Sequence, residues 1–233
     1  MGEKNLRILQ ERIGYVFANR NLLKNALTHS SYANEKKWNY SANNERLEFL
    51  GDAVLETVSS QFIFQNNPDM VEGAMTKLRA SLVCEMSLAS AARDIGLGEY
   101  LFLGKGERST GGAQRDSILS DAFEALIGAV FLDGGLEPAS DFIHQYVLSD
   151  IEQKQLFYDS KTILQEIVQD RWHQSTLITY PIMKEEGPDH DKRFLVSCEI
   201  NGRQYASGWG HTKKAAQQQA AYRTIMMIRH EDE

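Results

Sequence analysis

The chain has 233 residues and a formal net charge of −7, from 25 basic and 32 acidic side chains. Its content of 42% hydrophobic and 24% charged residues is close to the average of globular proteins, which excludes a disordered or fibrous chain. The acidic balance counts against nucleic acid as a partner, because phosphate binders present a basic surface, unless two domains of opposite charge are hidden in the sum.

The beginning of the chain carries charges throughout its first twenty residues, so no signal peptide is predicted there. The longest apolar run, residues 125–132, is far shorter than the roughly 20 residues of a membrane span. The two cysteines, Cys84 and Cys198, are too far apart in the sequence to indicate a disulfide framework or a zinc site. We therefore expect a cytoplasmic protein with no membrane partner.

The first two-thirds of the chain has the periodicity of helices, with apolar residues three and four positions apart. The clearest runs lie within residues 47–58, 78–89 and 119–130. No strand is expected before residue 160. Residues 1–150 are therefore predicted to form an all-α domain.

Acidic residues occupy unusual positions in two of these predicted helices. Glu45, Glu48 and Asp52 fall on one stripe at 100° per residue, and stacked like charges destabilise a helix by roughly 0.2–0.5 kcal/mol per pair. Asp121 and Glu124 are three residues apart in a strongly apolar helix, where charges are costly unless they are paired or bind a metal.

Five carboxylates without an adjacent His or Cys suit a hard cation such as Mg²⁺, which prefers oxygen ligands and keeps waters for a phosphate substrate. Two such ions about 3.5–4 Å apart can promote phosphodiester hydrolysis. The alternative is an acidic face that only keeps the protein soluble. A di-iron bundle is rejected because it needs Glu-x-x-His pairs, and residues 141–144 are a poor match.

The pattern changes near residue 150. Residues 151–159 are polar and are predicted to be a linker or the fraying end of a helix. A short helix is expected from Ser160 to about Asp170. Charge also changes here, because residues 1–159 hold 15 basic and 22 acidic side chains, whereas residues 160–230 hold 10 and 7.

Strands are predicted over residues 176–184 and 193–200, where apolar and polar residues alternate. Asn201-Gly202 then indicates a tight hairpin into a third strand, because both central residues of such a turn need positive φ. Thr212 is expected to cap a last helix that ends near Ile228. Residues 160–230 are thus predicted to form an α+β domain of order α-β-β-β-α.

Lys213 and Lys214 stand in the first turn of this last predicted helix. The helix dipole favours anions there by some 0.3–1 kcal/mol per charge, so two cations lower the stability of the helix. The placement makes sense if a phosphate binds at that end. The alternative is two solvated lysines.

The run NERLEFLGDAV at residues 44–54 closely resembles the signature segment of bacterial ribonuclease III. Residues 26–32, 104–107 and 121–128 resemble three further segments of that family, and the resemblance covers nearly the whole chain. It implies a Mg²⁺-dependent endonuclease for double-stranded RNA, with Mn²⁺ as a substitute for Mg²⁺.

The resemblance also implies roles for individual acids. Glu48, Asp121 and Glu124 match metal ligands of the family, and Glu124 is taken as catalytic together with Asp52, which holds the metal or its attacking water. Two further acids, Glu45 and Glu72, match family residues near the metal site and the subunit interface. His29 is interpreted as structural.

By the same resemblance the protein is a homodimer with one cleavage centre per subunit. Phe49 matches a residue that packs into the partner subunit; from the sequence alone it is an ordinary core residue. Two offset cuts would leave 5′-phosphate and 3′-hydroxyl ends with two-nucleotide 3′ overhangs. The implied substrates are ribosomal RNA precursors and structured messenger RNA.

The α-β-β-β-α order with its lysine pair resembles a double-stranded RNA-binding domain, which reads A-form shape across two minor grooves. The resemblance places Gln165 and Glu166 at one minor groove, His190 at the next, and Lys213 and Lys214 at the phosphates between them. The family often has a third lysine where this chain has Gln217. That difference should weaken binding and flatten its salt dependence by about one unit or less.

A non-catalytic, dimeric double-stranded RNA-binding protein is the alternative function. Such a protein should have lost at least one of the four acids Glu48, Asp52, Asp121 and Glu124. All four are present.

Overall fold

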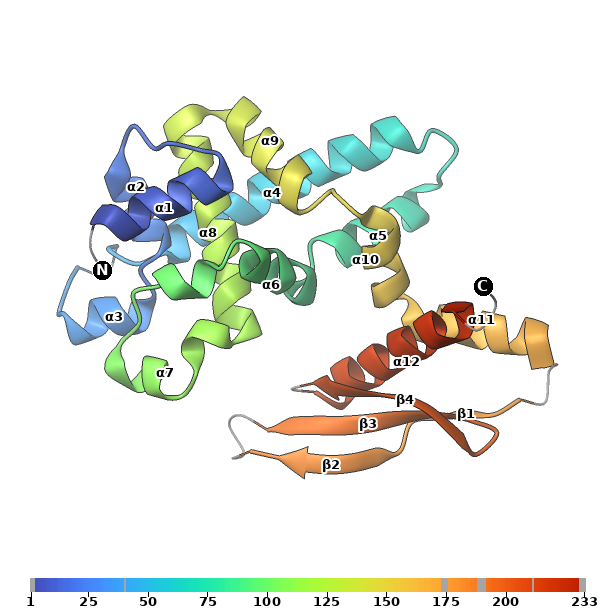
Figure 1. Cartoon of the computed structure of the whole chain (residues 1–233). Coiled ribbons are helices and arrows are strands. Elements are labelled where there is room, and N and C mark those ends of the chain that lie inside the picture. Colours follow the sequence, from blue (N-terminus) through green and yellow to red (C-terminus); the bar gives the residue numbers. More distant parts are fainter. Residues whose placement is uncertain (1–2, 40, 173–175, 188–191, 211, 231–233) are drawn as a thin grey trace. The chain divides into compact units, whose positions relative to one another are not determined.

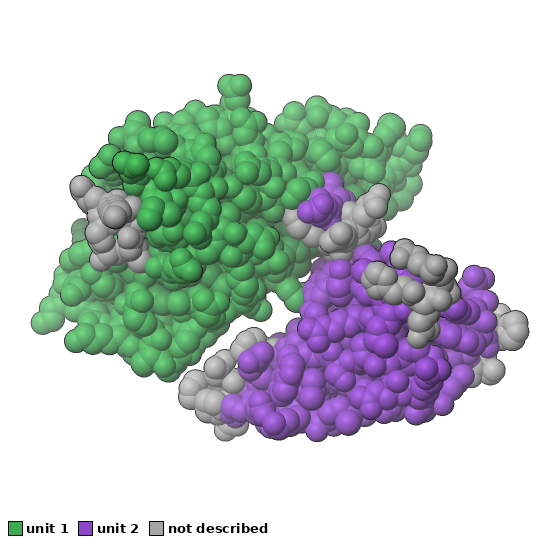
Figure 2. All heavy atoms as spheres, viewed as in Figure 1, with its two compact units in different colours: residues 1–149 green, residues 150–233 purple. Residues whose placement is uncertain are grey.

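The computed structural model describes residues 3–39, 41–172, 176–187, 192–210 and 212–230 (Figure 1). The chain divides into two compact units, Met1–Ser149 and Asp150–Glu233 (Figure 2). Within the described ranges, no helix combines the length and apolar character needed to cross a membrane.

Unit 1 is helical, as the apolar periodicity predicts. Its described residues form no strand, and Thr28 and Phe102 make a single isolated bridge. The elements are α1 (Glu3–Ile13), α2 (Arg20–Ala26), α3 (Ser30–Glu35), α4 (Glu45–Asn66), α5 (Glu72–Leu82), α6 (Glu85–Asp94), η1 (Leu97–Tyr100), α7 (Lys105–Ser109), η2 (Gly112–Gln114), α8 (Asp116–Gly134) and α9 (Leu136–Tyr146).

Helices α4 and α8 pack against each other at very short range at the centre of unit 1. Two glycines make this approach feasible. A Cβ atom on Gly51 of α4 would overlap the backbone oxygen of Glu124, and one on Gly128 of α8 would overlap that of Leu47. The contact therefore brings the acidic turns of the two helices together.

The apolar run over residues 78–89 continues through a break between two helices. α5 ends at Leu82, and Cys84 has an extended backbone before α6 begins. The Ser87 hydroxyl donates a hydrogen bond of 2.8 Å to the carbonyl of Ser81, one of the acceptors that the end of α5 leaves free. The periodicity alone does not reveal this break.

Unit 2 contains an antiparallel sheet of four short strands, β1 (Ile178–Thr179), β2 (Ile182–Glu186), β3 (Arg193–Ile200) and β4 (Arg203–Gly210). β1 and β2 both pair with β3, and β4 pairs with β3 as well. The single strand predicted over residues 176–184 is thus divided at Tyr180 and Pro181, because proline has no N–H for the ladder. The predicted order α-β-β-β-α holds, with the first strand in two pieces.

The hairpin and the helix cap follow the sequence prediction. Asn201 and Gly202 have φ values of 51° and 79°. The Thr212 hydroxyl accepts a hydrogen bond of 3.1 Å from the backbone N–H of Ala215 and so caps α12 (Lys213–His230). α12 packs on β3 and β4 and beside α11 (Ser160–Trp172).

Residues 151–158 form a helix, α10 (Ile151–Tyr158), where a linker or fraying helix end is predicted. Leu156 explains the difference, because it is buried in the same apolar cluster as Leu164, Val168 and Ile225. The segment therefore packs as part of unit 2.

Candidate active site and RNA-binding surface

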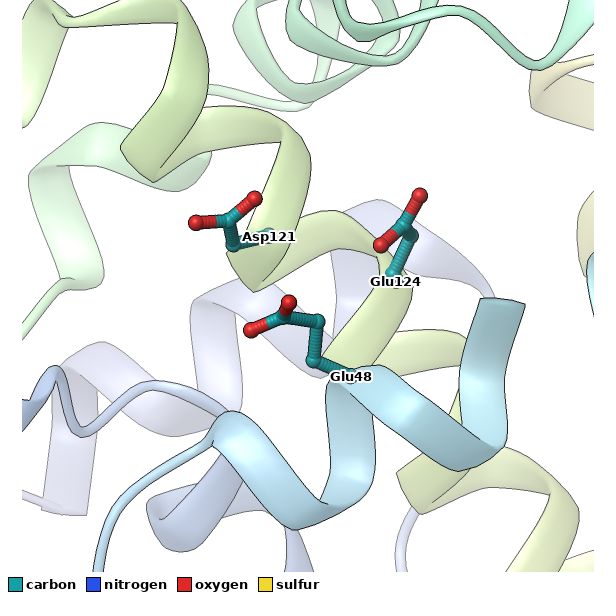
Figure 3. Close-up of side chains that lie close together, drawn as sticks. All are labelled: Glu48, Asp121 and Glu124. Carbon is teal, nitrogen blue, oxygen red and sulfur yellow. The ribbon is translucent and has the colours of Figure 1, made fainter. Parts of the chain in front are cut away.

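Three carboxylates from α4 and α8 converge on one space in unit 1. Glu48 comes from α4, and Asp121 and Glu124 come from successive turns of α8 (Figure 3). One ligand atom of each lies within 4.8 Å of those of the other two. Within the described part of the chain, this is the one group of three or more residues with metal-ligand spacing. We call it the acidic cluster.

Burial and mutual repulsion make the acidic cluster retain protons. Burial is the main cause that raises the pKa of Glu124 to about 8, with further contributions from Asp52, Glu48 and Asp121. Burial also raises the pKa of Glu48 to about 7, assisted by Asp121, Glu45 and Asp52. A bound cation would favour the ionised carboxylates, so metal and protons compete for this site.

The chemistry of the donor atoms fits a hard divalent cation. All three side chains of the acidic cluster offer carboxylate oxygens and are half-buried. Mg²⁺ and Mn²⁺ accept such ligands, whereas zinc sites usually include Cys or His. These residues could therefore hold a metal of the magnesium type.

Two residues near Asp121 were not connected with the site by sequence reasoning. Burial raises the pKa of Asp121, whereas a hydrogen bond from Ser120 and the proximity of His29 lower it. His29 also caps α3, because its Nδ1 accepts a hydrogen bond of 3.2 Å from the N–H of Ser31. The structural role expected for His29 is therefore seen, together with an electrostatic effect on Asp121. Ser120 adjoins Asp121 in the sequence, whereas only the fold brings the distant His29 close to it.

The other predicted acids surround the acidic cluster or lie apart from it. Asp52 and Glu45 are exposed on α4, close enough to raise the pKa of Glu48. Glu72, at the start of α5, accepts a hydrogen bond of 2.9 Å from Thr76 and lies outside the acidic cluster. Their catalytic and interface roles stay predictions.

Phe49 projects from α4 with 81% of its surface exposed, which is unusual for a large apolar side chain. It is not the core residue that the sequence alone favours. Helices α4 and α5 also line an open cavity of about 410 Å³, whose lining includes Ile63, Phe64, Glu72 and Met75. An exposed aromatic side chain and an apolar cavity thus occur on the same unit.

Those residues predicted to contact RNA that the structure describes are exposed in unit 2. Gln165 and Glu166 lie on α11, and Lys213 and Lys214 lie in the first turn of α12. His190 lies outside the described residues. The surface offers two ammonium groups at a helix N-terminus, which is an arrangement that can bind phosphate.

Comparison with known proteins agrees with this architecture. A family model described as Ribonuclease-III-like matches residues 19–151, and one for the double-stranded RNA binding motif matches residues 160–226. Proteins named Ribonuclease 3 from Pelotomaculum thermopropionicum and Oceanobacillus iheyensis are 48% and 46% identical to the chain. These alignments cover 96% of this chain in both cases, and 93% and 98% of the two relatives.

Solved structures show the same relationship for unit 1. A crystal structure of the nuclease domain of ribonuclease III from Campylobacter jejuni has a TM-score of 0.57 and 42% identity, over 62% of this chain and 94% of that one. A second structure of that domain, also with a TM-score of 0.57, is described as flexible in a region involved in dimer formation. These matches favour an endoribonuclease over the alternative of a non-catalytic binder. The chain belongs to the ribonuclease III family and is an endoribonuclease with a double-stranded RNA-binding domain.

Proposed function

We propose that the chain hydrolyses phosphodiester bonds in double-stranded RNA with Mg²⁺, for which Mn²⁺ can substitute. The observation that carries this proposal is the acidic cluster of Glu48, Asp121 and Glu124, whose oxygens lie within 4.8 Å of one another. Half-buried carboxylates with raised pKa values lower the stability of the metal-free fold, so a function that requires a cation accounts for their presence.

The residues of the acidic cluster and the neighbouring Asp52 have different roles in hydrolysis. When bound, a divalent ion offsets the charge of the phosphate and lowers the pKa of water. Glu48, Asp121 and Glu124 supply the oxygen ligands. Asp52 orients the attacking water from the exposed side. Water adds to phosphorus as the bond to the 3′ oxygen breaks, which leaves 5′-phosphate and 3′-hydroxyl ends.

The exposed Phe49 supports a homodimer. Burying an aromatic side chain of 150–250 Å² is favourable by roughly 25 cal/mol per Å². A two-fold dimer would place Phe49 of each protomer in the α4–α5 cavity of the other, where Glu72 would then face the interface. The Campylobacter nuclease domain, for which dimer formation is described, supports the same assembly.

A dimer has two cleavage centres, so two offset cuts would leave two-nucleotide 3′ overhangs. Ribosomal RNA precursors and structured messenger RNA are the substrates we propose, because they contain long duplex segments. Incubation of a long RNA duplex with the protein and Mg²⁺, followed by end analysis, tests the chemistry. We expect cleavage of the duplex, with the separate strands left intact. Ends with 5′-hydroxyl and 3′-phosphate would contradict the proposed direction of attack.

A further inference from the structure

Lys161 joins the two helices of unit 2 that carry the predicted RNA contacts. It is exposed at the start of α11, and its Nζ donates a hydrogen bond of 2.8 Å to the amide oxygen of Gln217 on α12. The same ammonium group lies 4.9 Å from the centre of the Tyr180 ring, a distance at which a cation is attracted to the aromatic face. Contacts from α12 and from the segment between β1 and β2 thus hold this charge at the junction of α11 and α12.

The junction lies on the side of α12 that already carries a predicted phosphate contact. Gln217 follows Lys213 by four residues, so the two share one side of the helix and are about 6 Å apart along its axis. Lys161 also precedes Gln165 by four residues and shares its side of α11. Lys161 thus shares a side of α11 with one predicted RNA contact, and its hydrogen-bond partner Gln217 shares a side of α12 with another.

The partner of Lys161 leaves its charge available. Gln217 is neutral, and an ammonium group has three N–H donors, so two remain for phosphate oxygens after the bond to Gln217. Other lysines of unit 2 are placed differently. Lys184 pairs with Glu186, and Lys192 pairs with Glu185, so a carboxylate offsets each of these charges.

We propose that Lys161 is a third phosphate-binding cation of the duplex RNA surface, beside Lys213 and Lys214, and that Gln217 positions its ammonium group. The proposal rests on the RNA-binding function of unit 2. It also changes the expectation drawn from the uncharged residue at position 217, because a side chain from α11 supplies a charge there.

The test compares two variants of the full chain, each of which lacks one lysine charge. Lys161→Gln removes the proposed contact, and Lys184→Gln removes a lysine of β2 that already has a carboxylate partner. The affinity for an RNA duplex is measured in EDTA by fluorescence anisotropy, from about 50 to 300 mM KCl. We expect Lys161→Gln to weaken binding about three- to tenfold and to lower the slope of log affinity against log salt by about one. Lys184→Gln should stay within about twofold of the wild type.

A second variant distinguishes two roles of Lys161: a contact with RNA phosphate, or a structural link between α11 and α12. Lys161→Gln combined with Gln217→Lys moves the charge from α11 to α12 and should restore both affinity and salt slope. The thermal midpoint of each variant, measured without RNA, should match that of the wild type. Equal RNA affinity and slope for Lys161→Gln and Lys184→Gln would overturn the proposal, as would a loss of affinity that the relocated charge does not restore.

The RNA-binding function itself is checked in the same assay. If the wild type binds duplex RNA and Lys213→Gln with Lys214→Gln weakens it, unit 2 acts as proposed, and the result for Lys161 stands alone. If the lysine pair has no effect, the proposed RNA surface is wrong and the inference about Lys161 is wrong with it.

Discussion

The acidic cluster concentrates carboxylates at the expense of stability. Each of its three side chains is half-buried, and burial raises the pKa of each because it disfavours the charged form. Neighbouring carboxylates raise the pKa values of Glu48 and Glu124 further. Such a group favours the folded state when protonated and disfavours it when ionised. The loss of folding stability that the ionised carboxylates cause should therefore be measurable in the metal-free protein.

Replacing Glu124 with glutamine should stabilise the metal-free protein at alkaline pH. The folded pKa is raised from 4.5 to about 8, so the stabilising contribution is complete below about pH 4.5 and is lost as the pH rises through about 8. Because the side chain is partly exposed, we expect a gain of about 1–3 kcal/mol at about pH 9 in EDTA, and little at about pH 5. Urea unfolding measures it, with Glu137→Gln on the exposed surface of α9 as the control. A gain equal to that of the control at both pH values would contradict the electrostatic explanation.

The spacing of carboxylates on two predicted helices indicated a metal site formed by five acids, and the family resemblance identified three of them as the metal ligands. Glu48, Asp121 and Glu124 were expected as metal ligands, and the structure brings them together. The effect of His29 on Asp121 could not be predicted, because helix periodicity says nothing about contacts between distant segments. Nor does the sequence say that Glu72 lies outside the acidic cluster.

At the level of elements, the close approach of α4 and α8 is what creates the acidic cluster. Gly51 and Gly128 lie where any side chain would meet the backbone of the opposite helix. The sequence shows these glycines only as weak helix formers, and their purpose is apparent once the two helices are in contact. A backbone contact of this kind cannot relax by a change of rotamer.

Gly51→Ala should therefore destabilise unit 1. Overpacking at a rigid contact costs typically about 1–3 kcal/mol, and here the obstacle is backbone. Gly73→Ala on α5 is the matched control, because a Cβ atom there meets nothing within 4 Å. It should leave stability unchanged or raise it by up to about 1 kcal/mol. Thermal unfolding of both variants checks this, and equal stabilities would mean that the α4–α8 contact is looser than described.

Element types were predictable from the sequence more fully than element boundaries. The Asn201-Gly202 hairpin and the Thr212 cap depend on local backbone chemistry, and both were predicted. The helix break at Val83 and the helix over residues 151–158 depend on side-chain hydrogen bonds and on burial of Leu156. Such tertiary contacts determine where a helix begins or ends, and the local sequence pattern does not reveal them.

At the scale of the whole molecule, the chain consists of two units, and charge is distributed unevenly along it. Residues 1–159 hold an excess of acidic side chains, whereas residues 160–230, which make up most of unit 2, hold an excess of basic ones. The negative net charge of the complete sequence thus hides the excess of basic side chains in residues 160–230, which carry the RNA-binding motif. Unit 2 contains its own apolar cluster, which includes Leu156 of α10. A cut that separates the units cleanly therefore falls after Ser149.

A chain that ends at Ser149 should retain residual cleavage at low salt and bind duplex RNA more weakly, most visibly at higher salt. The reason is that the loss of unit 2 removes the proposed phosphate contacts of Lys213 and Lys214 and leaves the acidic cluster in place. Anisotropy with an RNA duplex at several salt concentrations measures the affinity. If the shortened chain binds as tightly as the full one, unit 2 is not the RNA-binding domain.

The most direct test of the central claim is the rate of duplex RNA cleavage in Mg²⁺ by the wild type and by Glu124→Gln, with Glu137→Gln as control. We expect Glu124→Gln to be at least about 100-fold slower, since even the loss of a group that only supports a metal ligand costs 10–100-fold. Its affinity for the duplex should be unchanged, and Glu137→Gln should cleave like the wild type. Cleavage by Glu124→Gln at the wild-type rate would contradict the assignment of the acidic cluster as the catalytic metal site.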